Sequence, residues 1–291
     1  MKQYKTDEEL LNYLEAKNVT VKNRKFALKK LEKYTYYSIV NSYKYNFKDA
    51  NNDYFPNVTF EEIYALYEFD KNLKLIMLKY ALEVESFIKS LISNHISNVY
   101  GINAYLNVNN LDNKANLAVR KRLIDKINED INHNYGIHLA ITHYIDNYGF
   151  VPPFVLTKIL TFGVISSYYG LLEQSDRQII AKRFKISDVL LKQILKCLTN
   201  IRNICAHNNR LFCYRDKYTL KFKEIDSNYT PKDNLTNLYM MIRAMQILLE
   251  KRQYNSLVKA VEKEINKLNN KLNSININNI LRIMGYPNVW I

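Results

Sequence analysis

Three side chains near residue 205 have the types and spacing needed for acid–base chemistry on a phosphate. They are Arg202, Asn203 and His207, within the segment 188–215. A histidine can remove or donate a proton near neutral pH, and an arginine can hold the non-bridging oxygens of a phosphate as negative charge builds. The asparagine could fix the histidine tautomer or bind the phosphate. The set fits RNA cleavage by attack of the 2′-OH, with these three residues as catalytic groups and no metal or other cofactor.

The residues before this set have the pattern of a helix. On it Asn203 and His207 share a face, whereas Arg202 lies about 140° from His207. One helix therefore does not bring Arg202 and His207 together, but two copies crossing antiparallel could, and we predict a homodimer. The alternative is an ordinary helix end with capping side chains and a nearby cation. The apolar stripe consists of Leu190, Ile194, Cys197, Leu198, Ile201 and Cys205.

The net charge of +14 favours a polyanionic partner. Segment 182–223 has eleven Lys and Arg against two Asp, an excess of nine. A second basic cluster at 22–33 leads into a Tyr-rich run that could stack on bases or pack in the core. No segment combines strong basicity with a bare apolar face, so we expect RNA and no membrane. The predicted RNA-binding residues are Lys22, Arg24, Lys25, Lys29, Lys30, Tyr36, Tyr37, Asn208, Arg210 and Arg215.

The cysteines and the N-terminus favour a reducing, cytoplasmic setting. There are 3 cysteines, odd in number and without CxxC spacing. The N-terminal MKQYKTDEEL is polar, unlike a signal peptide, and no apolar run approaches the roughly 18 residues of a membrane span. His133, His138 and His143 recur at five-residue intervals, which does not imply zinc; surface or substrate-facing histidines explain them.

The sequence predicts an all-α protein. Only 6 Gly and 5 Pro interrupt the 291 residues, which favours long helices. Capping boxes at Thr6-x-x-Glu9 and Thr59-x-x-Glu62 start a first helix over 6–17 and the longest apolar stripe, about 60–98. Further helices are predicted at 117–131, 154–172, 176–184 (capped by Ser175), 188–205 (capped by Ser187), 232–250 (opened by Pro231) and 254–273.

Two carboxylates in the long helix could matter to the motif. Glu83 or Glu85 could face Arg202 across the core, or both could lie in solvent. Elsewhere, alternation at Tyr218, Leu220 and Phe222 predicts a short β-hairpin near 214–224. Trp290 could dock the end of the chain.

We divide the chain into three parts. Residues 1–58 form an N-terminal basic and aromatic helical region, 59–230 a helical core with irregular insertions that carries the motif, and 231–291 a C-terminal helical hairpin. In this hairpin the helix over 254–273 has an apolar stripe close to a heptad seam. The stripe could pack within the chain or pair two chains.

The motif also carries a family resemblance. RNICAH, from Arg202 to His207, is an R-x4-H motif that resembles that of HEPN-domain ribonucleases. The surrounding RNICAHNNRLF resembles the Abi (abortive infection) family, AbiD/AbiF-like, over about 5–215. Asn208 stands where many relatives have a second His, and the Tyr-rich N-terminal motif departs from the family pattern. The other matching stretches are LEKYTYYSIVNSY, FEEIYALYEFDKNLK, the E-x-E of Glu83 and Glu85, and VPPFVLTKILTFGVISSYY.

The resemblance implies a HEPN-like helical bundle that cleaves RNA at a site built from two protomers. It implies that Arg202 and His207 are catalytic and that Asn203 supports them. Such proteins protect bacteria from phage by halting growth of the infected cell. Some AbiF-like members resemble toxins held in check by a non-coding RNA, and a structured RNA regulator would suit this basic chain.

Two other functions remain open. In the first, the cluster grips a structured RNA without cleaving it, as a non-catalytic module of a defence complex. In the second, the protein is a purely structural dimerisation protein. RNA cleavage that depends on His207 distinguishes the nuclease from both.

Overall fold

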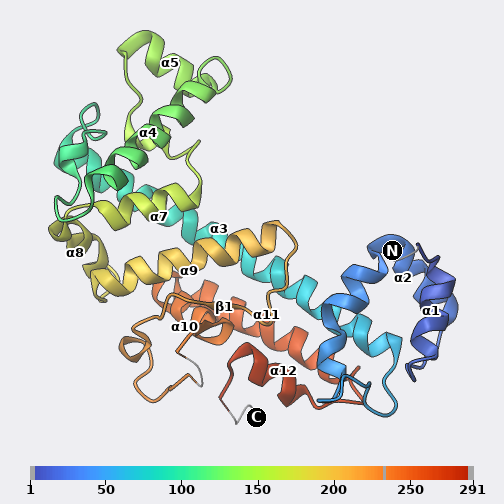
Figure 1. Cartoon of the computed structure of the whole chain (residues 1–291). Coiled ribbons are helices and arrows are strands. Elements are labelled where there is room, and N and C mark those ends of the chain that lie inside the picture. The colour runs from blue at the N-terminus through green and yellow to red at the C-terminus, as the bar shows by residue number, and fades with distance from the viewer. Residues whose placement is uncertain (1–3, 232–233, 288–291) are drawn as a thin grey trace.

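One helix, α3 (Phe60–Tyr100), runs through most of the molecule and organises the rest (Figure 1). The computed structural model describes residues 4–231 and 234–287. The predicted capping box is present: Thr59 accepts from the amide of Glu62, and the Glu62 carboxylate accepts from the amide of Thr59. The helix ends at Gly101, whose φ of +81° an L-residue rarely adopts. Its 41 residues give a rod about 60 Å long.

The N-terminal residues form short helices at the start of α3. α1 (Asp7–Glu15) and α2 (Arg24–Tyr34) pack together, and the capping box predicted at Thr6 and Glu9 is present. A π-helical turn, η1 (Tyr37–Asn41), and a 3-10 turn, η2 (Lys44–Phe47), follow. The break between α2 and η1 falls at Thr35, which has a φ of +62°.

The middle of the chain forms an arm and then returns to α3. After η3 (Val108–Asn110), α4 (Leu117–Asn134) and α5 (Leu139–Tyr148) project from the body (Figure 1). The single helix expected over 154–172 is wrong: α6 (Pro153–Leu156) and α7 (Phe162–Leu171) replace it. The break occurs because the Thr161 hydroxyl accepts from the amide of Val164 and starts a new helix.

Two further helices lead to the motif. α8 (Gln174–Lys182) is flanked by Glu173, so the expected cap at Ser175 is wrong. α9 (Asp188–Ala206) begins where the sequence predicts, with the Ser187 hydroxyl accepting from the amide of Leu190. Its apolar stripe is buried against α3 and α7.

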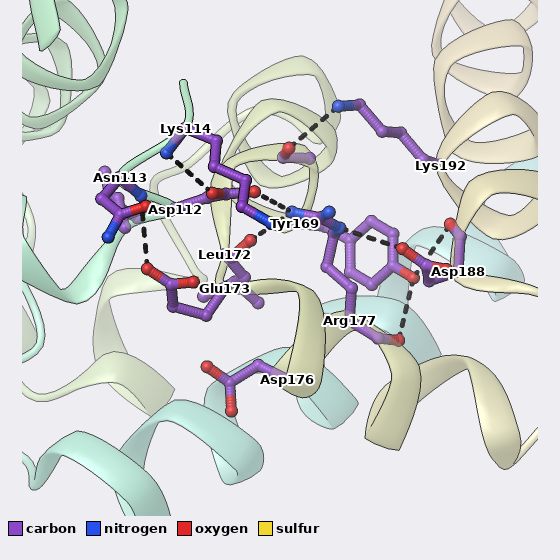
Figure 2. A network of polar contacts seen from close by, with 12 residues as sticks. Asp112, Asn113, Lys114, Tyr169, Leu172, Glu173, Asp176, Arg177, Asp188 and Lys192 are labelled. Atoms are coloured by element: carbon purple, nitrogen blue, oxygen red, sulfur yellow. Dashed lines mark hydrogen bonds and ion pairs between the residues drawn. The ribbon is translucent and has the colours of Figure 1, made fainter. Parts of the chain in front are cut away.

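A polar network fixes the start of α9 (Figure 2). The Arg177 guanidinium donates to Asp112 at 3.1 Å and to Asp188 at 3.3 Å. The Tyr169 hydroxyl donates to the carbonyl of Asp188, and Lys192 donates to the carbonyl of Gly170. These contacts join the loop before α4, α7, α8 and α9. The helix that carries the motif is therefore held firmly at its N-terminal end.

The C-terminal helices complete the core. η4 (Phe222–Glu224) precedes a loop to α10 (Leu238–Leu248), which is followed by α11 (Lys251–Asn269) and α12 (Ile277–Met284). α10 starts after Asn237, which caps it, and not at Pro231. α11 packs along α3 within this chain. Trp290 lies outside the described residues.

The predicted hairpin has a different partner. Strand β1 (Arg215–Asp216) lies in the expected range, but it pairs antiparallel with β2 (Thr236–Asn237), some twenty residues later. Local alternation did not reveal this pairing because the partner strand lies beyond η4. Apart from this pair and three isolated β-bridges, the regular structure in residues 4–231 and 234–287 is helical, as predicted. Among the described residues no helix is both long and apolar enough to cross a membrane.

Candidate functional site

Arg202 lies on α9 opposite a buried carboxylate of α3. Its Nε is 3.7 Å from Oε2 of Glu85, and Oε1 of Glu85 accepts from Lys89 at 2.8 Å. Of the two glutamates considered, Glu85 is therefore the one that faces Arg202, while Glu83 is exposed. The distance of 3.7 Å is too long for a hydrogen bond, and both facing atoms are buried without a hydrogen-bond partner.

The pair of Arg202 and Glu85 differs from a structural ion pair, because the two facing atoms make no hydrogen bond. A buried polar atom without a partner costs free energy, so such atoms are rare and call for an explanation. The Arg202 side chain is 34% exposed, so the guanidinium is held at its base by Glu85 while part of it remains accessible. This arrangement would let Arg202 bind an anion that approaches from solvent.

His207 lies at the end of α9 with its side chain exposed. Asn208 takes the left-handed conformation, with a φ of +56°, and the amide of Asn209 donates to the carbonyl of Ile204. This pattern is a Schellman motif, in which asparagine can replace the usual glycine. The motif ends the helix just after His207 and so fixes where its imidazole leaves the backbone.

Two charged residues of α3 hold the turn that follows His207. Lys74 is buried and donates to Oδ1 of Asn208 at 2.5 Å. Asp70, one turn earlier, accepts from the amides of Leu211 at 3.0 Å and Phe212 at 2.7 Å. A buried cation near the C-terminus of a helix is favourable because the last carbonyls carry partial negative charge. The end of the motif is thus positioned by α3 and not by α9 alone.

Within one chain Arg202 and His207 stay on different sides of α9. The helix continues without distortion to Ala206, so the angle of about 140° expected from the sequence is kept. Asn203 is exposed, as His207 is. The chain therefore does not by itself bring the predicted arginine and histidine into one site.

The predicted RNA-binding residues fall into groups with different surroundings. Tyr37 and Arg210 line the same groove beside the turn after α9, where the Arg210 guanidinium donates to the carbonyl of Ser42 at 2.7 Å. Asn208 lines the same groove, but its side-chain oxygen accepts a hydrogen bond from Lys74. Tyr36 is half-buried, and burial raises its pKa.

The basic residues of the N-terminal cluster lie on and before α2, which packs against α1 and η1 (Figure 1). Arg24 is bridged to Glu8 and Glu15 of α1, and Lys30 lies over the rings of Phe26 and Tyr64. Arg215 donates to the carbonyl of Ile283 and so ties β1 to α12. The side chains of Lys22, Lys25 and Lys29 are exposed.

The three cysteines are buried or half-buried, and His95 has a structural partner, whereas His133 and His143 are exposed. Burial raises the pKa of Cys205, inside the motif, to about 12, so its thiol stays protonated at neutral pH. Nε2 of His95 is 2.8 Å from Asp176, which links α3 to α8. In the part of the chain that the structure describes, no three His, Cys, Asp or Glu side chains are grouped so that they could hold a metal ion.

The comparison with known families agrees with the motif. The family model described as Abi-like protein matches residues 29–213, which includes η1, α3, α9 and the turn after His207. The chain belongs to the Abi-like protein family. Its role is therefore in abortive-infection defence. No curated protein and no solved structure matches it.

Sequence reasoning missed several residues around the motif of this Abi-like protein. Asp70 and Lys74 anchor the turn, and Lys89 completes the pair at Glu85. A signal was present, because Asp70 interrupts the apolar stripe of α3 between Leu66 and Leu73. A charged residue at a core position usually has a buried partner.

Proposed function

We propose that this Abi-like protein is a metal-independent endoribonuclease of the HEPN type that halts growth of infected cells. The observation that carries the proposal is the accessible guanidinium of Arg202, held by the buried carboxylate of Glu85, on the helix that ends at the exposed His207. Family membership and the R-x4-H motif support it. We further propose that a structured non-coding RNA binds and regulates the protein, since its net charge is +14.

The proposed reaction needs two proton transfers at one phosphate. The 2′-oxygen attacks the adjacent phosphorus as its proton passes to a base, and the bond to the 5′-oxygen breaks as that oxygen gains a proton. The products are a 2′,3′-cyclic phosphate and a 5′-hydroxyl. A histidine can serve as base or acid, and Arg202 would stabilise the charge on the non-bridging oxygens.

A second copy of the chain would complete this site. Arg202 and His207 diverge on one helix, so we propose that a homodimer brings the arginine of one protomer near the histidine of the other. Leu75 and Leu82 support an interface beside the motif, because they are 60% and 47% exposed on the side of α3 that also carries Glu85. Large apolar side chains grouped on a surface often mark contact sites.

Expression in bacteria tests the nuclease. We expect wild-type protein to arrest growth and fragment RNA, and His207→Ala to do neither, since the proposed acid–base group is gone. His133→Ala on α4 is the matched control, because His133 is also exposed but lies away from the motif, and it should keep full toxicity. Equal toxicity of wild type and His207→Ala would overturn the proposal.

A non-catalytic RNA-binding function is the second candidate. Segment 182–223 favours it, because its excess of nine positive charges can bind RNA whether or not the RNA is cleaved. Purified protein that retains bound RNA, leaves it intact in the presence of EDTA and binds equally well as His207→Ala would support this candidate.

A further inference from the structure

A polar groove of about 620 Å³ opens beside the turn that follows His207. Its lining residues come from three parts of the chain: the segment of η1 and η2, two residues of α3, and Asn208–Arg210 after α9. Its twelve lining residues include three cations, Lys44, Lys74 and Arg210, and no carboxylate. Three other hollows of the surface each contain at least one glutamate. The groove therefore has the electrostatic character of an anion site.

Two tyrosines at the groove present their rings to solvent. The side chain of Tyr37 is 74% exposed and that of Tyr45 is 65% exposed. In contrast, Tyr43 forms part of the floor, stacked on Phe212 with its hydroxyl donating to Asp70 at 2.7 Å. Tyr43 is therefore a packing residue, whereas Tyr37 and Tyr45 remain exposed, with the Lys44 ammonium 5.4 Å from the centroid of the Tyr45 ring. Exposed aromatic rings beside cations are what unpaired nucleotides bind.

The lining of the groove begins one residue after the predicted catalytic histidine. Asn208, which lines it, is the next residue after His207, and Lys74 bonds to Asn208 from below. Arg210 closes the other wall through its bond to the carbonyl of Ser42. Both walls are thus fixed relative to the end of α9. A chain of phosphates lying in the groove would therefore pass the turn that directly follows His207.

We propose that this groove binds single-stranded RNA on one side of the scissile phosphate, with bases stacked on Tyr37 and Tyr45 and phosphates at Lys44 and Arg210. The proposal deepens the nuclease function and rests on it. Unpaired RNA is favoured because bases in a duplex are already stacked and cannot also stack on a tyrosine. The groove is lined by hydroxyls, amides and cations, which suits a polyanion better than an apolar peptide.

Binding can be measured separately from cleavage in the His207→Ala background. The probe is a 5′-labelled single-stranded RNA of mixed sequence, followed by fluorescence anisotropy, with the same RNA as a duplex for comparison. Adding Tyr37→Ala and Tyr45→Ala should weaken single-strand binding at least about tenfold and leave duplex binding unchanged. The matched control adds Tyr135→Ala and Tyr148→Ala, two exposed tyrosines of the α4–α5 arm, and should leave both affinities unchanged.

The salt dependence gives an independent measure of the phosphate contacts. Lys44→Ala should reduce the slope of log affinity against log salt by about 0.7, as expected for one phosphate contact on a single strand. Lys121→Ala on α4 is the control and should not change the slope.

The outcomes separate this proposal from the nuclease itself. Unchanged single-strand binding by the double tyrosine variant would contradict RNA binding in the groove. So would the absence of single-strand binding by the parent His207→Ala protein. Equal weakening for single strand and duplex overturns the assignment to unpaired RNA. Binding that depends on the tyrosines, in a wild type that cleaves no RNA, supports the groove and overturns the nuclease.

Discussion

The buried carboxylate of Glu85 orients the partly exposed guanidinium of Arg202, which can then bind an anion. It is bonded to Lys89 at 2.8 Å through one oxygen and faces Arg202 at 3.7 Å through the other. The guanidinium is therefore oriented without all its donors being used. Pre-orientation of this kind matters because a misplacement of about 1 Å can lower a rate a hundredfold.

We predict that Glu85→Gln lowers the rate of RNA cleavage at least about tenfold, because Arg202 loses the charge that orients it. The affinity for RNA should change by less than about twofold, since the groove cations remain. Single-turnover cleavage and anisotropy measure the two effects.

Glu83→Gln is the control for this change, since Glu83 is on the same helix but exposed. A loss of cleavage that is equal in the two variants, or a parallel loss of RNA affinity, would show that Glu85 does not act through Arg202.

At the scale of elements, α3 joins parts of the chain that are far apart in sequence. Its first turn holds the segment after α11: Oε1 of Glu62 accepts from the amides of Asn273 at 2.6 Å and Ser274 at 2.7 Å. Farther along, Asp70 and Lys74 hold the turn after α9. Burial alone would raise the pKa of Glu62, but hydrogen bonds from Ser274, Asn273 and Thr59 outweigh it and hold the pKa below 4.5.

We predict that Glu62→Gln lowers the free energy of unfolding by about 2 kcal/mol at pH 7, because charge-assisted hydrogen bonds are lost. A lowered folded pKa gives stability that is present above the unfolded value near 4.5 and disappears as pH falls through the folded value. The difference between wild type and variant should therefore shrink below pH 4.5. Urea unfolding at pH 7 and at lower pH measures it.

Glu68→Gln serves as the control for Glu62. Its ion pair with Lys271 lies at the surface, so it should cost less than about 1 kcal/mol. A difference at Glu62 that persists unchanged at acidic pH would contradict the assignment.

In the whole molecule, one protomer contains Arg202 and His207 but does not bring the two side chains together. α9 is straight through the motif, so Arg202 and His207 point to different sides. The apolar residues Leu75 and Leu82 are exposed on α3, and Leu82 lies one turn before Glu85. A two-fold contact there would bury them and unite the two catalytic groups.

We predict that Leu75→Glu with Leu82→Glu converts a dimer to a monomer and abolishes RNA cleavage, because charge at the interface opposes association. Light scattering and a cleavage assay measure the two effects. Leu139→Glu is the control, since Leu139 is 87% exposed at the start of α5, away from the motif. A wild type that is monomeric and still cleaves RNA would contradict the composite site.

The helical class, the long central helix and the motif follow from local sequence patterns. Periodic apolar residues and the cap at Thr59 act locally, so the bounds of α3 and the start of α9 at Ser187 could be predicted. RNICAH and the other matching stretches indicated the Abi family for the same reason, since each is a run of adjacent residues, and the family model over 29–213 confirms that family.

Which distant groups come into contact depends on how the elements pack in three dimensions. The choice of Glu85 over Glu83 as the partner of Arg202 depends on how α3 and α9 pack. Tyr45 and Arg210 line the same groove although they lie far apart in the sequence. Likewise, β1 pairs with β2, which lies beyond η4. Such contacts depend on packing between elements, which the periodicity of a single segment does not encode.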